Sequence, residues 1–266
     1  MGFVPDLLSY ACTHAPNHPA VVAGERRFTF AELDARARRL ARLFRDWSLE
    51  AGDIVALLAK NEPEYFEIHV ASIRAGLVLL PLNCRLAPPE LQYIVNDSRP
   101  RLLICGEEFS TISETLQVEH KCHLGAEYDR LLASADPADS PCGWVSAEAP
   151  FVILYTSGTT GRPKGTIISN RALFARIGCN LFEYQITAED RFLMCLQLFH
   201  IGSINCLSHL YVGSTVVLVK DFEAGHVLAR EVDPALAEVH GEILPEVGEL
   251  ERGADVVGAR LPVGLG

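Results

Sequence analysis

The stretch FVILYTSGTTGRPKG, residues 151–165, constrains the fold of this chain more than any other. Its first four residues form an apolar run with the length and the Val/Ile/Phe content of a buried strand. The run passes directly into small hydroxyl residues and glycines, which let a backbone turn sharply and present several N–H groups to one anion. We therefore predict a buried strand that leads into a phosphate-binding loop.

The side chains of this loop favour a polyphosphate ligand. The candidate phosphate-binding residues are Thr156, Ser157, Gly158, Thr159, Thr160, Gly161 and Lys164. Lys164 supplies a positive charge, and Pro163 fixes the direction of the chain just before it. The loop is not a Walker A motif, because Pro163 stands where the second glycine is required and Gly165 stands where Ser or Thr is required. The alternative, a surface linker, does not explain why the loop directly follows a buried strand.

The segment YTSGTTGRPKG, residues 155–165, resembles the signature loop of the adenylate-forming superfamily, which includes acyl-CoA synthetases, luciferases and peptide-synthetase adenylation domains. The resemblance implies that ATP and Mg²⁺ bind here. It also implies a catalytic role for Lys164, which would steady the leaving pyrophosphate together with the loop hydroxyls.

An alternation of strands and helices predicts an α/β fold. Strands are expected at 54–59, 77–82 and 101–105, with helices at 63–75 and 89–96 between them. Repeated units of this kind predict mostly parallel sheets covered by helices. The resemblance implies that residues 1–222 form part of the superfamily's large N-terminal AMP-binding domain.

Other elements are expected on both sides of these units. We expect a helix within residues 1–19, strands at 20–22 and 27–30, and a helix that begins at the capping box of Thr29 and Glu32. Five arginines on that helix are interpreted as a solvated surface. Further on, we expect a helix capped by Asn170, with Leu173 and Ile177 on its apolar stripe, and strands at 191–196 and 215–219.

Composition excludes several classes of function. The formal charge of −11 argues against binding to nucleic acid or to an anionic membrane. No apolar run reaches membrane-spanning length and no export signal is visible, so we expect a cytoplasmic protein without a transmembrane segment. The eight cysteines form no CxxC pair and are interpreted as small buried hydrophobic residues. The segment HKCH, residues 120–123, lacks distant ligands at zinc spacing and is interpreted as surface without a role.

A second candidate stretch is QLFHIGS, residues 197–203. It resembles the place where the superfamily separates the acyl pocket from the nucleotide, and His200 is our second candidate catalytic residue. Amino-acid-activating relatives carry an aspartate there, which pairs with the α-ammonium of the substrate. A neutral imidazole cannot balance a buried ammonium, so a plain carboxylic acid is the favoured substrate. The alternative reading is a hydrogen-bonded core histidine.

Lys220 is a further candidate, for a contact with CoA. It lies beside the place where related ligases carry a lysine near CoA, but counting from Phe222 puts Asp221 in register. The resemblance fades past about Leu228, and residues 223–266 are interpreted as a divergent acidic tail. Residues 221–266 contain ten acidic and three basic residues and no Ser, Thr, Asn, Gln, Lys, Cys or Tyr. We expect an out-of-frame or foreign sequence there.

The resemblance implies an acyl-CoA synthetase, which joins a carboxylic acid to AMP and then transfers the acyl group to the CoA thiol. The superfamily's adenine contacts, hinge and C-terminal catalytic lysine have no match in this sequence, so we expect a truncated and impaired ligase that forms little or no acyl-CoA. Two alternatives remain: a remnant that catalyses nothing, and a ligase that loads a carrier protein. The sequence does not indicate the acyl chain or the oligomeric state.

Overall fold

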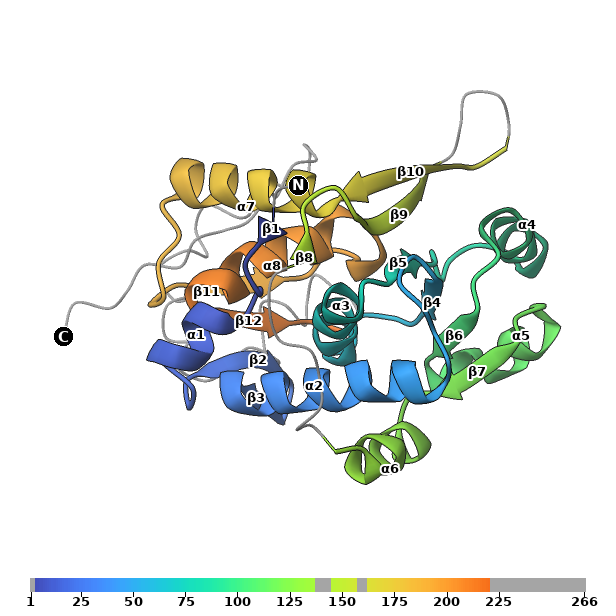
Figure 1. The fold of residues 1–266 in the computed structure, drawn as a ribbon, viewed down its shortest axis with the longest axis horizontal. Helices are drawn as coiled ribbons and strands as arrows, with labels where there is room; N and C mark the ends of the chain where they lie inside the picture. The colour runs from blue at the N-terminus through green and yellow to red at the C-terminus, as the bar shows by residue number, and fades with distance from the viewer. Residues whose placement is uncertain (1–2, 137–144, 157–161, 221–266) are drawn as a thin grey trace, which may run out of the picture.

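Two mostly parallel sheets organise the molecule (Figure 1). The computed structural model describes residues 3–136, 145–156 and 162–220. The six-stranded sheet has the order β10 (Lys164–Ser169), β9 (Pro150–Thr156), β5 (Val78–Pro81), β4 (Ile54–Leu58), β6 (Leu102–Cys105) and β7 (His120–His123). The four-stranded sheet has the order β11 (Arg191–Met194), β12 (Thr215–Leu218), β2 (Pro19–Ala23) and β3 (Arg26–Thr29). Within these sheets only β9–β10 and β2–β3 pair antiparallel.

Helices flank both sheets, which confirms the α/β expectation (Figure 1). They are α1 (Ser9–His14), α2 (Phe30–Asp46), α3 (Glu64–Ala75), α4 (Pro88–Ser98), α5 (Ser110–Thr115), α6 (Ala126–Ser134), α7 (Asn170–Tyr184) and α8 (Ser203–Val212), with a 3-10 turn η1 (Glu107–Phe109) and a π-helical turn η2 (Leu198–Gly202). A short pair, β1 (Phe3–Val4) and β8 (Val145–Ser146), lies outside the two sheets. Among the described residues no helix is both long and apolar enough to cross a membrane.

The predicted α2 is confirmed in detail. The Thr29 hydroxyl accepts from the Glu32 amide, and the Glu32 carboxylate accepts from the Thr29 amide at 2.8 Å, so the capping box is formed. The apolar stripe of α2, from Leu33 to Phe44, is buried. It packs on α3, which is buried on every side from Glu64 to Arg74. The core therefore runs between the helices and the two sheets.

The expected helix within residues 1–19 is present as α1, which is short and follows the strand β1. Two other local expectations were wrong. The N-cap of α7 is Ser169, whose hydroxyl accepts from the Ala172 amide, whereas Asn170 donates to the Ser146 carbonyl at 3.0 Å. The cysteines are not uniformly buried, because Cys179 is exposed.

The arginine face of α2 is not simply solvated. Arg36 Nε lies 2.5 Å from Glu67 Oε2, and Glu67 on α3 is 1% exposed. The Tyr128 hydroxyl donates to Glu67 Oε1 at 2.6 Å, and Arg36 also reaches Asp129 at 2.9 Å. Burial raises the pKa of Glu67 to about 6, while the hydrogen bonds from Arg36 and Tyr128 act in the opposite direction. The Arg36–Glu67 ion pair, together with Tyr128 and Asp129 of α6, therefore connects α2, α3 and α6.

Candidate functional site

The predicted phosphate-binding loop connects the two strands of an antiparallel hairpin, β9 and β10. Thr156 ends β9 and Lys164 begins β10, and these two residues face each other in the register. Both are exposed. The predicted residues Ser157, Gly158, Thr159, Thr160 and Gly161 lie outside the described residues. The hairpin thus brings the hydroxyl of Thr156 and the ammonium of Lys164 to the two sides of the loop.

Helix α4 holds this hairpin in place. The Tyr155 hydroxyl donates to Asp97 Oδ2 at 2.5 Å, and the Arg162 guanidinium lies 5.9 Å from the centre of the Tyr93 ring. Burial, together with the hydrogen bond to Asp97, raises the pKa of the Tyr155 phenol, so this phenol stays a donor at neutral pH. Each side of the loop is therefore anchored to the same helix.

A cleft of about 530 Å³ opens beside the hairpin. Its walls come from the ends of β5 and β9, from α4 with the loop before it, and from η2; they are formed by Pro81, Asn83, Leu86, Glu90, Ile94, Tyr155, Thr156, Pro163, Phe199 and His200. Thr156 and His200, 44 residues apart in the sequence, thus line one cleft. Ligands of open α/β sheets bind outside the carboxyl ends of the strands, and this cleft has that position.

His200 lies on an irregular turn and not in the core. The turn η2 is interrupted at His200, whose φ and ψ of −129° and −154° are not helical, and the side chain is exposed. The Ser203 hydroxyl donates to the His200 carbonyl at 3.1 Å. The alternative of a buried core histidine is therefore wrong.

Gly202 allows this turn to approach β11 closely. A Cβ atom there would lie 2.1 Å from Met194 Cε and 2.8 Å from the Gln197 carbonyl oxygen.

We expect Gly202→Ala to lower the free energy of unfolding by about 1 to 3 kcal/mol through overpacking, measured by urea denaturation. Gly178→Ala in α7 is the matched control, because its Cβ would meet nothing within 4 Å. The control should be stabilised by about 1 kcal/mol. A stabilised Gly202→Ala would contradict this packing.

Lys220 does not line the cleft. Its Nζ lies 2.5 Å from Glu62 Oε1, and its side chain is 55% exposed. Glu62 belongs to the loop between β4 and α3, so the ion pair joins the end of the four-stranded sheet to the six-stranded one. The expected contact of Lys220 with CoA stays a prediction.

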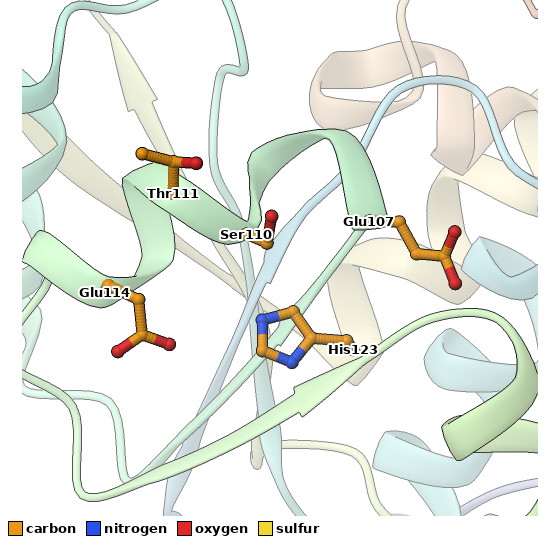
Figure 2. A pocket seen from close by; sticks show the side chains of 5 residues that line it. All are labelled: Glu107, Ser110, Thr111, Glu114 and His123. Atoms are coloured by element: carbon orange, nitrogen blue, oxygen red, sulfur yellow. The ribbon is translucent and has the colours of Figure 1, made fainter.

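A second hollow of about 500 Å³ lies between α5 and β7 (Figure 2). Its walls are Glu107, Ser110, Thr111, Glu114 and His123, and it contains none of the candidate residues. HKCH forms β7, an edge strand of the six-stranded sheet. Cys122 is buried and His123 Nε2 lies 3.2 Å from Ser113 Oγ, so the segment is not merely surface. In the described part of the chain no group of three or more His, Cys, Asp or Glu side chains could hold a metal.

The interpretation of the sequence missed the half of the cleft wall that comes from the end of β5 and from α4. Asn83 and Leu86, in the loop after the carboxyl end of β5, and Glu90 and Ile94, on the helix α4 that follows, were not singled out. Their position after a parallel strand was the available signal, because such ends face the ligand in open α/β sheets. The pairing of β9 with β10 was also missed, because residues 164–169, KGTIIS, do not alternate between apolar and polar types.

The AMP-binding enzyme family matches residues 8–234 of this chain. A fatty acid–[acyl-carrier-protein] ligase, ScoC, of Streptomyces coeruleorubidus is 33% identical, over 81% of this chain and 43% of the relative. A feruloyl-CoA synthase of an Amycolatopsis species is 35% identical, over 85% of this chain and 46% of the relative. The crystal structure of ATP-bound MatB from Rhodopseudomonas palustris is similar with a TM-score of 0.74 and 25% identity, over 85% of this chain and 48% of that chain. The chain thus spans less than half the length of these relatives.

Proposed function

The chain belongs to the AMP-binding enzyme family, and we propose that it takes part in the ATP-dependent activation of a carboxylic acid, as in acyl-CoA synthetases. One observation carries the proposal: the cleft at the carboxyl ends of β5 and β9 is lined by both Thr156 and His200. In the first half-reaction a carboxylate oxygen attacks the α-phosphorus of ATP, the bond to the bridging oxygen breaks, and pyrophosphate leaves. In the second, the CoA thiol replaces AMP on the acyl carbon.

The residues of the hairpin fit the phosphates of ATP. Lys164 is exposed and faces Thr156, so an ammonium and a hydroxyl can approach the same anion from two strands. Their contribution is charge neutralisation and positioning of the leaving pyrophosphate. Mg²⁺ would arrive with ATP, because this ion is held largely by substrate phosphates and water and needs few protein ligands. It would neutralise charge that develops on the phosphate oxygens.

The substrate class follows from the cleft wall at η2. An imidazole, and not a carboxylate, stands at position 200, which supports a plain carboxylic acid over an amino acid. Leu86 and Ile94 on the α4 side and Phe199 on η2 give the cleft an apolar character suited to an acyl or aryl group.

The acyl acceptor has two candidates. CoA is the first, in line with the feruloyl-CoA synthase. A carrier protein is the second, and the relative ScoC supports it. A pyrophosphate-release assay over fatty and aromatic acids tests the first half-reaction without either acceptor. Acid-dependent release supports the proposal, whereas ATP binding without release favours a remnant that only binds the nucleotide.

Lys164→Ala should weaken ATP binding by about 1.5 to 3 kcal/mol, because one charge-assisted contact is lost. Calorimetric titration of Mg-ATP measures this loss. Lys121→Ala is the matched control, since Lys121 lies on β7 at the opposite edge of the same sheet. Equal ATP affinity in the parent and in Lys164→Ala would rule out the phosphate contact.

A further inference from the structure

Asn61 lies in the loop between β4 and α3 and is only 3% exposed. Its carboxamide makes three hydrogen bonds to backbone groups that are far away in the sequence. Nδ2 donates to the Leu196 carbonyl at 2.8 Å and to the Val219 carbonyl at 3.0 Å, and Oδ1 accepts from the Leu198 amide at 2.9 Å. Both hydrogens of the amide and one lone pair of its oxygen are therefore used.

These bonds join the ends of strands from both sheets. β4 belongs to the six-stranded sheet, whereas Leu196 follows β11 and Val219 follows β12 of the four-stranded sheet. The Val219 amide donates to the Met194 carbonyl at 3.0 Å, so the carboxyl ends of the neighbouring strands β11 and β12 are already tied together. The Glu62–Lys220 ion pair lies one residue further along in each segment.

The segment that Asn61 holds carries part of the cleft wall. Leu196 and Leu198 lie past the end of β11, and Phe199 and His200 follow them directly into the cleft. Buried backbone groups need partners, and past the end of a strand a side chain must supply them. Asn61 does so from the sheet that also carries Thr156, through β4, β5 and β9.

We propose that Asn61 is a positioning residue that sets where Phe199 and His200 stand relative to Thr156. This role in ligand binding rests on the proposed function. A carboxamide is suited to it because it offers two donors and an acceptor in one plane. Aspartate lacks the donors, and glutamine is one methylene longer.

Amide hydrogen exchange of the full chain tests the positioning directly. In Asn61→Ala the Leu198 amide loses its acceptor, so peptides covering residues 195–203 should exchange about tenfold faster or more. Peptides from β4 and β6 should not change. Asn170→Ala is the matched control, because Asn170 is equally buried and its amide donates to Ser146 instead.

If Asn61→Ala does not fold, Asn61→Asp replaces it, since aspartate keeps the volume and the acceptor for Leu198. In that variant the carbonyls of Leu196 and Val219 lose their hydrogen-bond donor. Faster exchange is therefore expected across 195–203 and 217–220.

Ligand binding separates positioning from a purely structural role. Asn61→Asp should weaken the binding of octanoyl- and feruloyl-sulfamoyladenosine about tenfold or more, while the affinity for Mg-ATP changes less than about twofold, because ATP phosphates meet Thr156 and Lys164. Unchanged exchange at 195–203, or faster exchange with unchanged binding of both adenosine probes, would overturn the proposal. If the parent binds neither probe nor ATP, the proposed function fails, and the exchange experiment alone decides whether Asn61 holds this segment.

Discussion

Glu67→Ala is expected to lower the free energy of unfolding by about 3 kcal/mol or more, because it leaves a largely buried cation and a buried hydroxyl without their shared acceptor. The side chain of Arg36 is 19% exposed and that of Glu67 is 2% exposed. Tyr128 is fully buried, and its hydroxyl donates to the same carboxylate. Arg36 would still pair with Asp129 at 2.9 Å. We therefore expect the loss to lie near the lower end of the range for removing one partner of a buried ion pair. Urea denaturation at pH 7 measures it.

Asp46→Ala is the matched control on the same helix. Asp46 accepts from Arg42 at 2.9 Å, but both side chains are more than a third exposed. Exposed pairs contribute little because water screens them, so the expected loss is below about 1 kcal/mol. If Asp46→Ala and Glu67→Ala lower the free energy of unfolding by similar amounts, burial does not increase the contribution of the α2–α3 ion pair to stability.

Acid should destabilise the fold through His69. This side chain on α3 is fully buried against Phe151, with ring centroids 5.4 Å apart, and neither ring nitrogen has a hydrogen-bond partner among the described residues. Burial lowers the pKa of His69 to about 3. The unfolded chain, with a histidine pKa near 6.5, therefore binds the proton more readily. The contribution of His69 to stability is complete above about pH 6.5 and is lost progressively as the pH falls toward 3.

A variant isolates this contribution from the carboxylates that also titrate in acid. His69→Leu should unfold at nearly the same or a higher urea concentration at pH 7, because an unpaired polar group is replaced by an apolar one of similar volume. The free energy of unfolding of His69→Leu minus that of the parent should be about 3 kcal/mol larger at pH 4 than at pH 7. Ile68→Val, one residue away and equally buried, serves as control and should show a pH-independent difference. A His69→Leu difference that does not grow in acid would contradict a neutral buried imidazole.

Much of the fold could be predicted from the sequence because local signals and burial agree. The capping box of Thr29 and Glu32 and the stripe from Leu33 to Phe44 define α2 without reference to any other segment. The continuous apolar runs of β4, β5 and β6 predict parallel, buried strands. Contacts between distant segments could not be predicted, because no local pattern shows that Arg36 would meet Glu67 or that β10 would pair with β9.

The site was predicted to a smaller extent. Thr156 and Lys164 were singled out from their residue types, and His200 from the resemblance of QLFHIGS to the superfamily; the structure brings Thr156 and His200 to one cleft. The remaining wall depends on tertiary structure. Glu90 and Ile94 face the cleft because α4 packs beside the hairpin, and Asn61 reaches Leu196 across 135 positions of the sequence. A single polar residue in a loop gives no indication of such a partner.

The most direct test is amide hydrogen exchange of the parent chain with and without Mg-ATP. We expect ATP to slow exchange in peptides that contain Tyr155, Thr156 and Lys164, because bound phosphates order the hairpin that carries them. Peptides covering 107–123, which form the second hollow of Figure 2, are the internal reference and should not change. Protection confined to 107–123, or no protection of the hairpin at saturating ATP, would contradict the assignment of β9 and β10 as the nucleotide site.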